Sequence, residues 1–319
     1  MKCVCSAVSR VCQGDDFLEI VFLGTGATLP SKKRNVSSTA VKLDGGILLF
    51  DCGEGTQRQM IMSGVSYMKI EWIAISHFHG DHVLGIPGLL QSMNLSNRKN
   101  KLTFFGPEGT SVLLEYMRKG GLIPGSFPIS VVEMESGSAA RMGEYTIRAV
   151  NSTHGTTALS FRVDGKQRPG KFNPKKALEL GLKEGPQFSL LQKGKAVEAG
   201  GKTIRPSDVM GKPRPGPSVG YAVDTRPNRS IAGLMKDVDL LIFDSTFSQE
   251  LERRARLTGH STAVEAAGVA KKAGAGRLYL DHISARYEDT ALLLREARSV
   301  FRRSYLARDF LRVIVKPGA

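Results

Sequence analysis

The chain has 319 residues and combines 45 lysines and arginines with 30 acidic residues, which gives a formal charge of +15 at pH 7. Hydrophobic residues make up 41% of it, enough for a large buried core, but no stretch approaches the roughly 20 apolar residues that a membrane-spanning helix needs. The positive charge favours a polyanionic partner, such as nucleic acid, an anionic membrane surface or a phosphorylated substrate.

Cysteine usage predicts a protein without a disulfide framework. Four cysteines are too few for one, and three of them (Cys3, Cys5 and Cys12) precede the first predicted strand. Reduced thiols in a cytoplasmic protein and an N-terminal metal or redox role both fit that cluster. The N-terminus lacks the apolar segment of a signal peptide. We therefore expect residues 1–16 to be a tail and the protein to be cytoplasmic.

Strand and helix patterns alternate along the chain. In the N-terminal part, the patterns predict strands at residues 17–23, 38–43, 47–50 and 72–76, and helices from Thr56 and near residues 82–93. Further on, they predict strands at residues 102–105, 129–133, 145–150, 219–223, 240–243 and 277–280, and helices at 111–119, from Thr262 and from about Glu288. Strands mixed with helices throughout predict a layered α/β fold rather than separate all-α and all-β parts.

Residues 165–217 interrupt this pattern. The segment is rich in Gly, Pro and Lys, has little apolar periodicity, and carries twelve lysines and arginines against four acidic residues. A loop of this length inside a compact domain is usually functional or flexible. We therefore expect a basic, flexible arm inserted into a single catalytic domain that spans residues 17–319.

Potential metal ligands crowd into the loop after the strand at residues 72–76. In the sequence His77-Phe78-His79-Gly80-Asp81-His82, four of six residues offer a nitrogen or oxygen donor. Three of the chain's six histidines lie here, and packing does not readily explain a His-x-His pair. Neutral imidazole together with carboxylate suits zinc, so the loop predicts a metal site.

Three further donors lie at the ends of predicted strands. His154 follows the strand at 145–150, Asp224 ends the strand at 219–223, and His282 ends the strand at 277–280. Taken alone, each of them could equally be a turn-forming residue or a polar residue with its hydrogen bonds satisfied. Strand ends gather on one face of a sheet, so together with the histidine-rich loop they predict one site.

Seven donors exceed the needs of one zinc ion, because an open tetrahedral site uses three protein ligands. Two metal ions that share one carboxylate would use all seven. The predicted division assigns His77, His79 and His154 to one metal, Asp81, His82 and His282 to the other, and Asp224 to both as the bridge. Manganese or iron suits the same nitrogen and oxygen donors.

The order of these motifs resembles the metallo-β-lactamase superfamily, in which HxHxDH is followed by an isolated His, an Asp and a His. Further segments resemble the ribonuclease Z family within it, and they run from about residue 17 to the C-terminus. These segments are Phe22-Leu23-Gly24-Thr25-Gly26, Pro30-Ser31-Lys32-Lys33-Arg34-Asn35, Asp51-Cys52-Gly53-Glu54-Gly55-Thr56-Gln57, Asp224-Thr225-Arg226-Pro227, Gly259-His260-Ser261-Thr262 and His282-Ile283-Ser284-Ala285-Arg286-Tyr287.

The resemblance implies an αβ/βα four-layer sandwich, two zinc ions per subunit and a homodimer. It implies an endoribonuclease that removes 3′ trailers from precursor tRNA, leaving a 3′-hydroxyl on the tRNA and a 5′-phosphate on the trailer. In this family a long arm holds the body of the tRNA while the partner subunit cuts. Residues 165–217, with Gly185-Pro186, resemble that arm.

Asp81 and His260 are the candidate catalytic residues. Asp81 can ligate a metal and accept the proton of the attacking water, a role that the resemblance also implies. His260 is left over from the metal set and precedes a helix capping box, Thr262-Ala263-Val264-Glu265. The resemblance implies that His260 protonates the leaving 3′ oxygen. The alternative is a histidine that caps the helix or is merely buried.

In this family, an acidic residue in a His-Glu-Ala-Thr segment supports the matching histidine. Here the segment reads Phe243-Asp244-Ser245-Thr246, so its first histidine is absent and Asp244 stands in place of the glutamate. Asp51 has no place among the metal ligands. Two interpretations of it remain open: it orients a metal-bound imidazole through a hydrogen bond, or it forms a turn together with Gly53.

Basic residues suggest where RNA binds. Lys32, Lys33 and Arg34 lie in a loop that this family uses near the tRNA 3′ end, and a merely solvated basic loop is the alternative. Arg34 could make paired hydrogen bonds to a phosphate. In the arm, lysines including Lys171, Lys175 and Lys176 are expected to contact backbone phosphates, which sets affinity rather than sequence preference. A soluble loop without a partner is the alternative there.

Two other classes of protein compete with this interpretation. A small-molecule hydrolase of the same superfamily would need neither a basic arm nor a Lys-Arg loop. An RNA-binding protein with a structural zinc would have a closed site with four protein ligands, rather than surplus donors and a spare histidine. We therefore expect a metal-dependent endoribonuclease that acts on precursor tRNA.

Overall fold

The structure is a computed structural model that describes residues 17–123 and 125–318. The predicted N-terminal tail, with Cys3, Cys5 and Cys12, lies outside the described residues. The described residues divide into a large unit, within residues 17–164 and 217–318, and a small unit, Gly165–Gly216, and each is described by itself. Among the described residues, no helix is both long and apolar enough to span a membrane.

The first sheet of the large unit has seven strands in the order β16-β1-β2-β3-β4-β5-β6. Strands β3 to β6 are parallel to one another, and β16, β1, β2 and β3 pair in antiparallel fashion. The bounds are β1 (Leu18–Gly24), β2 (Ser38–Leu43), β3 (Gly46–Phe50), β4 (Ile70–Ala74), β5 (Leu102–Gly106), β6 (Ile129–Glu133) and β16 (Arg312–Val315).

The second sheet also has seven strands, in the order β15-β14-β13-β12-β9-β8-β7. Strands β12 to β15 are parallel, whereas β7, β8, β9 and β12 pair in antiparallel fashion. The bounds are β7 (Ala139–Met142), β8 (Tyr145–Asn151), β9 (Leu159–Asp164), β12 (Ser218–Ala222), β13 (Leu240–Asp244), β14 (Arg277–Asp281) and β15 (Ser304–Leu306).

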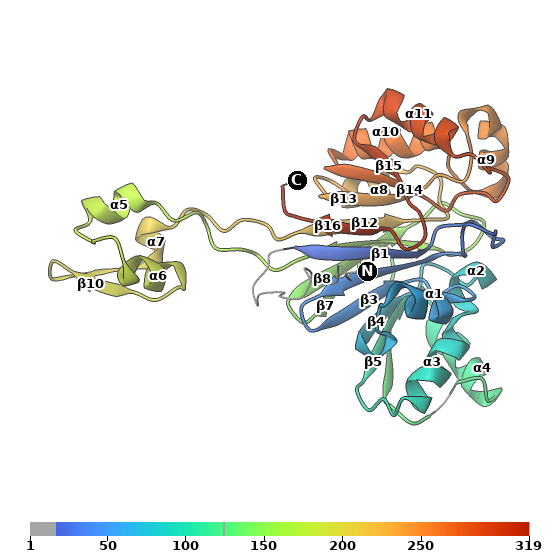
Figure 1. Cartoon of the computed structure of the whole chain (residues 1–319), viewed down its shortest axis with the longest axis horizontal. Coiled ribbons are helices and arrows are strands. Elements are labelled where there is room, and N and C mark those ends of the chain that lie inside the picture. Colours follow the sequence, from blue (N-terminus) through green and yellow to red (C-terminus); the bar gives the residue numbers. More distant parts are fainter. Residues whose placement is uncertain (1–16, 124, 319) are drawn as a thin grey trace, which may run out of the picture. The chain divides into compact units, whose positions relative to one another are not determined.

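Helices cover the outer face of each sheet (Figure 1). The first sheet is covered by α1 (Thr56–Ser63), α3 (Ile86–Leu95) and α4 (Thr110–Lys119), and the second by α8 (Arg229–Leu234), α10 (Ala263–Ala273) and α11 (Ala291–Val300). Short helical turns fill the connections: η1 (Tyr67–Lys69), α2 (Gly80–Val83), η2 (Gln249–Leu251) and α9 (Glu252–Thr258). This confirms the predicted αβ/βα four-layer sandwich.

Strand β1 is buried on both of its faces, as expected for a strand in an inner layer of the sandwich. Its Ile20 and Phe22 belong to the cluster between the two sheets, and its Val21 and Leu23 belong to the cluster under the helices of the first sheet. Successive strand side chains point to opposite faces, so a run that is apolar at every position buries both faces. Between the sheets, the rings of Phe50 and Tyr221 stack with centroids 4.6 Å apart.

One predicted helix differs in the structure. The pattern predicted a single helix near residues 82–93, but α2 ends at Val83 and α3 begins at Ile86. The chain turns at Gly85, whose amide donates to Cys52 O, and a Cβ there would lie 2.1 Å from Gly53 O. The break therefore comes from a backbone contact between segments far apart in the sequence, which periodicity does not report.

The small unit contains regular elements where the sequence predicted a loop. It has α5 (Pro174–Glu179), α6 (Pro186–Gln192), α7 (Pro206–Val209) and a hairpin of β10 (Val197–Ala199) and β11 (Lys202–Ile204). Six buried residues form its own apolar cluster: Ala177, Leu182, Leu191, Val197, Ile204 and Val209. At its base Arg168 and Arg214 pair through two backbone hydrogen bonds of 2.8 and 2.9 Å.

Candidate metal centre

The seven predicted metal ligands come from four loops at one edge of the sandwich. His77 to His82 lie between β4 and α2, His154 follows β8, Asp224 follows β12, and His282 follows β14. Three of these strands belong to the second sheet, where β12 and β14 run parallel, so their carboxyl ends face the same way. The structure brings all seven side chains together.

Several residues here have a left-handed backbone conformation that only glycine adopts freely. Asp51, Asp224 and His282 have φ angles of 53°, 48° and 58°, and each comes directly or almost directly after a strand. Such conformations cost about 1–3 kcal/mol each and cluster at functional sites. The backbone is therefore strained at these three residues.

The donors fall into two groups that share one residue. His77, His79, His154 and Asp224 form one group, and Asp81, His82, Asp224 and His282 form the other; within each group the donor atoms lie within 4.8 Å of one another. The grouping coincides with the division predicted from the sequence. The shared residue is Asp224 in both cases.

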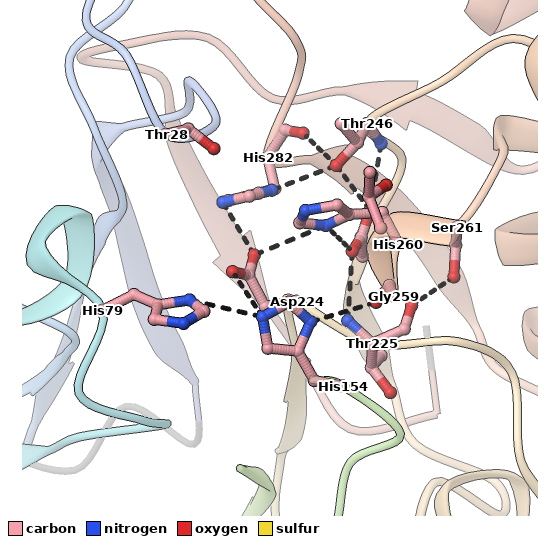
Figure 2. Close-up of polar contacts among 12 residues, drawn as sticks. Thr28, His79, His154, Asp224, Thr225, Thr246, Gly259, His260, Ser261 and His282 are labelled. Carbon is pink, nitrogen blue, oxygen red and sulfur yellow. Dashed lines mark hydrogen bonds and ion pairs between the residues drawn. The ribbon is translucent and has the colours of Figure 1, made fainter. Parts of the chain in front are cut away.

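The two oxygens of Asp224 face different neighbours. Its Oδ2 lies 3.3 Å from His77 Nε2 and 3.7 Å from His154 Nε2. Its Oδ1 lies 2.7 Å from His282 Nε2, on the side away from His79 (Figure 2). Oδ2 also lies 3.4 Å from His82 Nε2, so the carboxylate contacts donors of both groups.

Unpaired polar atoms supply a test of whether a metal fits. Four buried atoms among the described residues make no hydrogen bond: His77 Nε2, His82 Nε2, His282 Nε2 and Asp224 Oδ1. His282 Nε2 and Asp224 Oδ1 are 2.7 Å apart, but they do not have hydrogen-bond geometry. Leaving such groups unpaired costs about 1–3 kcal/mol each. Imidazole nitrogens and a carboxylate oxygen that converge in this way fit a site for divalent metal ions.

The other ring nitrogens are held by protein groups. Nδ1 of four histidines has a partner: Ser76 Oγ at 3.0 Å for His77, Asp51 Oδ2 at 2.8 Å for His82, Gly259 O at 3.1 Å for His154 and Thr246 Oγ1 at 3.0 Å for His282. A partner behind each ring fixes its orientation and keeps Nε2 directed inward.

Asp51 is the most heavily bonded of these partners. It is fully buried and accepts from His82 Nδ1 and Tyr221 Oη at 2.8 Å each, and from the amide and hydroxyl of Ser76 at 2.7 and 2.9 Å. Its position behind His82 agrees with the predicted role of orienting an imidazole. Its left-handed backbone also forms the turn after β3, so the geometry contains both predicted features.

Charges within the cluster shift several pKa values. Burial works against ionisation of Asp81, but His282 and His82 outweigh it and lower the pKa of that carboxyl. Burial also disfavours a charged His282, yet the charge of Asp224 dominates and raises its pKa to about 10. Burial lowers the pKa of His77 to about 4. A metal ligand must be deprotonated, so a metal held by His282 would displace a proton from its ring.

A pocket of about 560 Å³ opens onto the donors. Asp81, His79, His154 and Asp224 line it, together with His260. At its rim the amide of Thr28, another residue with positive φ, donates to Asp81 Oδ2 at 2.9 Å. The donor groups are therefore accessible to a substrate, unlike a closed structural site.

His260 lies beside both groups, as Figure 2 shows, and is paired with the acid predicted for it. Its Nδ1 lies 2.9 Å from Asp244 Oδ2. Burial alone would lower the pKa of His260, but the charge of Asp244 outweighs it and raises the pKa above its usual value. The predicted capping box is present at Thr262 and Glu265, and His260 lies two residues before Thr262, the N-cap of α10.

Asp224, Asp244, His260 and His282 form a third compact group of donors. Asp244 is already saturated: its Oδ1 accepts from the amide and hydroxyl of Thr246, and its Oδ2 accepts from His260 and from the amide of Thr225. A carboxylate with four protein donors has no free oxygen for a metal. This group therefore differs from the other two.

The predicted RNA-binding residues are distributed over both units. Lys32 and Lys33 are exposed, but the guanidinium of Arg34 donates to Thr25 Oγ1 at 2.6 Å and to Ala307 O at 2.7 Å. One nitrogen of the guanidinium, Nη1, is therefore bonded within the protein, and the phosphate contact of Arg34 stays a prediction.

In the small unit, Lys171, Lys175 and Lys176 are exposed around a pocket of about 490 Å³. Gly185, with a φ of 145°, and Pro186 begin α6.

Some residues of the site were not identified from the sequence. Ser76, Thr246 and Tyr221 support the ring nitrogens or the carboxylate behind them, and Thr28 contacts Asp81. Ser76 and Thr246 lie within two residues of a predicted site residue, which was the available signal. Thr28 carries no such signal, and Tyr221, three residues before Asp224, was not identified because its partner Asp51 lies 170 positions away.

The two sheets, their helices and the His/Asp cluster are those of the metallo-β-lactamase fold. The metallo-β-lactamase fold protein YhfI from Bacillus subtilis superposes with a TM-score of 0.68 at 19% identity, over 94% of this chain and all of that chain. Human tRNase Z, short form, superposes with a TM-score of 0.66 at 23% identity, over 92% of this chain and 98% of that one. A family model described as anti-Pycsar protein Apyc1 matches residues 18–161.

Sequence similarity narrows the class further. Ribonuclease Z of Methanosarcina mazei is 44% identical over 299 residues, which are 93% of this chain and 98% of that protein. The chain belongs to the ribonuclease Z family, and it is a hydrolase that acts as an endoribonuclease. Family membership sets aside both the small-molecule hydrolase and the RNA-binding protein with a structural zinc.

Proposed function

We propose that this member of the ribonuclease Z family cuts precursor tRNA in the cytoplasm at the 3′ end of the tRNA, leaving a 3′-hydroxyl there and a 5′-phosphate on the released trailer. The observation that carries the proposal is a paired His260 and Asp244 beside two donor groups that share Asp224. A proton donor next to a two-metal donor set is the combination that phosphodiester hydrolysis uses.

The proposed ligands are His77, His79 and His154 for one metal, Asp81, His82 and His282 for the other, and Asp224 for both. Unpaired inward-facing nitrogens and an unpaired Asp224 oxygen support this assignment. Zinc is the proposed metal, and manganese or iron suits the same donors. When bound, two such ions supply Lewis-acid activation of a water and neutralise charge on the phosphodiester.

The chain's own groups hold and move the protons. Asp81 lines the pocket with a lowered pKa, so its carboxylate is ionised at neutral pH, and it is the proposed acceptor of the proton from the attacking water. Asp244 occupies Nδ1 of His260, so the second ring nitrogen, Nε2, is the one that donates to the leaving 3′ oxygen. The raised pKa of His260 keeps that proton available near neutral pH.

We also propose that Gly165–Gly216 is an RNA-binding arm and that the enzyme is a homodimer in which each arm serves the partner's site. The exposed lysines Lys171, Lys175 and Lys176 support phosphate contacts by the arm. Lys32 and Lys33 are the proposed contacts near the site, whereas Arg34 is proposed to hold its loop. Shape rather than sequence would then govern recognition of the tRNA.

The reaction is tested with a 5′-labelled precursor tRNA that carries a 3′ trailer, incubated with the metal-loaded protein. We expect one cut next to the discriminator base, a 3′-hydroxyl on the labelled product, and loss of activity with a chelator. If the precursor stays intact while a chromogenic phosphodiester is hydrolysed, the site acts on another phosphodiester.

The dimer is tested by mixing two inactive proteins. One lacks residues 166–216, and the other carries Asp81→Ala with its arm intact. If an arm serves the partner's site, co-expressed mixed dimers regain cleavage, because one intact site meets one intact arm. If no activity returns although mixed dimers are isolated, each arm serves its own site.

A further inference from the structure

Arg226, two residues after the shared Asp224, contacts the main chain of His260. Its Nη1 donates to His260 O at 2.7 Å and to Glu265 Oε2 at 2.6 Å, while Nη2 pairs with Glu265 Oε1. The two side chains are only 14% and 17% exposed. Arginine and carboxylate thus form a bidentate pair, and one guanidinium nitrogen is shared with the carbonyl of the histidine.

Glu265 connects this pair to the start of α10. Its Oε2 accepts the amide of Thr262 at 2.9 Å, and Thr262 Oγ1 accepts the amide of Glu265. The capping box therefore fixes Glu265 relative to the helix, and Arg226 fixes His260 relative to Glu265. The other backbone hydrogen bond of His260 is its amide to Ala255 O at 2.9 Å.

Thr225 contacts the carboxylate that is bonded to the ring of the same histidine. Its amide donates at 3.0 Å to Asp244 Oδ2, the oxygen that also faces His260 Nδ1. Its carbonyl accepts from the hydroxyl of Ser261, as Figure 2 shows. The ring and the main chain of His260 are thus both tied to two consecutive residues, Thr225 and Arg226.

The same two residues are tied to the loop that carries His154. The amide of Arg226 donates to Thr153 O at 2.9 Å, and the amide of Thr153 donates to Thr225 Oγ1 at 3.0 Å. Arg226 therefore lies between a loop that supplies a proposed metal ligand and the loop that supplies the proposed proton donor. A side chain in that place can set the position of the second relative to the first.

We propose that Arg226 is a positioning residue that places His260 for protonation of the leaving 3′ oxygen; this rests on the proposed function of His260. In the reaction, a water oxygen forms a bond to phosphorus and the bond from phosphorus to the 3′ oxygen breaks. The electron pair of that bond stays on the 3′ oxygen, which takes the proton from His260 Nε2. The water gives up its proton to Asp81.

Losing the Arg226 contact affects the step that needs the proton. A misplacement of about 1 Å can cost on the order of 100-fold in rate, and general acid catalysis contributes about 100- to 10,000-fold. We therefore expect Arg226→Gln to lower the single-turnover rate of precursor cleavage by about 10- to 100-fold. The affinity for the precursor and the metal content are expected to be unchanged, because Arg226 touches no proposed ligand side chain.

The test compares two precursors that differ in one atom. The first has the ordinary 3′ oxygen at the cleavage site, and the second has sulfur in that bridging position. A thiolate leaves without a proton, so a defect in the proton donor disappears with the sulfur substrate. Single-turnover rates of both substrates, precursor affinity and metal content are measured for each variant.

Four variants make the comparison. His260→Ala removes the proposed proton donor, and Arg226→Gln removes the guanidinium that contacts the main chain of His260. Arg226→Lys keeps a positive charge that can still reach the carbonyl of His260. Arg162→Gln is the matched control, because Arg162 also joins a carboxylate (Asp164) to backbone carbonyls (Leu234 and Lys236) and is 17% exposed. The double variant of His260→Ala with Arg226→Gln measures whether the two act through each other.

If Arg226 positions His260, we expect Arg226→Gln to be slow only with the oxygen substrate and Arg226→Lys to recover part of the rate. Arg162→Gln should match the wild type. Adding Arg226→Gln to His260→Ala is expected to cause no further loss. Equal slowing of both substrates by Arg226→Gln overturns the inference, as does full additivity in the double variant. If His260→Ala itself slows both substrates equally, the proposed role of His260 fails instead.

Discussion

Replacing Asp51 by asparagine turns the buried carboxylate behind His82 into an amide of nearly the same size. In the wild type four donors point at this carboxylate, from His82 Nδ1, Tyr221 Oη and the amide and hydroxyl of Ser76, at 2.7 to 2.9 Å. An amide has one acceptor oxygen, and its NH₂ group must face at least one of these donors. The Asp51→Asn variant would therefore leave one buried donor without a partner.

Two separate losses follow from this geometry. A buried donor without a partner costs about 1–3 kcal/mol, which lowers the free energy of unfolding of the metal-free protein by that amount. Removing the carboxylate behind a metal-binding imidazole lowers metal affinity about 10- to 100-fold. That second loss is equivalent to about 1.4–2.8 kcal/mol of binding free energy.

The two losses are measured independently. Metal affinity comes from competition with a chromogenic chelator, and stability comes from urea unfolding of the metal-free protein. Tyr221→Phe is the control, because it removes one donor and leaves the carboxylate behind His82, so metal affinity should stay within about threefold of the wild type. If Asp51→Asn lowers stability while metal affinity is unchanged, Asp51 only forms the turn, and the orienting role is refuted.

Three further outcomes are expected. Asp81→Ala should abolish cleavage while precursor affinity, measured by gel shift, stays within about threefold, since phosphate contacts dominate binding; loss of both would indicate misfolding. Joining residue 165 to residue 217 through Asn-Gly should leave thermal stability and diester hydrolysis intact, because Asp164 and Ser218 face each other across β9 and β12. Precursor cleavage should be impaired, and an equal fall in both activities would contradict a substrate-holding arm. Gly85→Ala should destabilise the protein by about 1–3 kcal/mol or more in urea unfolding, because its Cβ would meet Gly53 O at 2.1 Å. Gly88→Ala, which meets only the end of the Gln57 side chain at 3.2 Å, should be neutral or stabilising.

Most of the donor set could be predicted because its members are marked locally. Four of the seven proposed ligands lie within His77–His82, and the others follow apolar strands, so pattern and chemistry coincide. The strands of both sheets were predicted where the apolar run is long, as in β1 and β12. The short edge strands β7, β15 and β16 were missed because three or four residues carry too little periodicity. Strand β9, six residues long and between β8 and β12, was also missed.

Contacts between distant segments account for the rest. Arg34 was assigned to phosphate by its motif, but its guanidinium is bonded to Ala307 O, 273 positions away. Arg226 lies in a motif whose arginine had no assigned role until the structure placed it on His260. The apolar cluster of the small unit was missed because its residues alternate with lysines and glycines over short elements, which hides the pattern of a core.

The left-handed residues at the strand ends have a consequence for engineering. Asp51, Asp224 and His282 hold φ angles that glycine adopts without strain, but glycine at Asp51 would leave four buried donors unpaired. At Asp224, whose Oδ1 makes no hydrogen bond, glycine would relieve backbone energy while removing a functional side chain. A screen for heat resistance alone would therefore be drawn toward replacements that destroy the enzyme. Directed evolution of this scaffold needs selection for turnover from its first round, because durability and catalysis compete at Asp224.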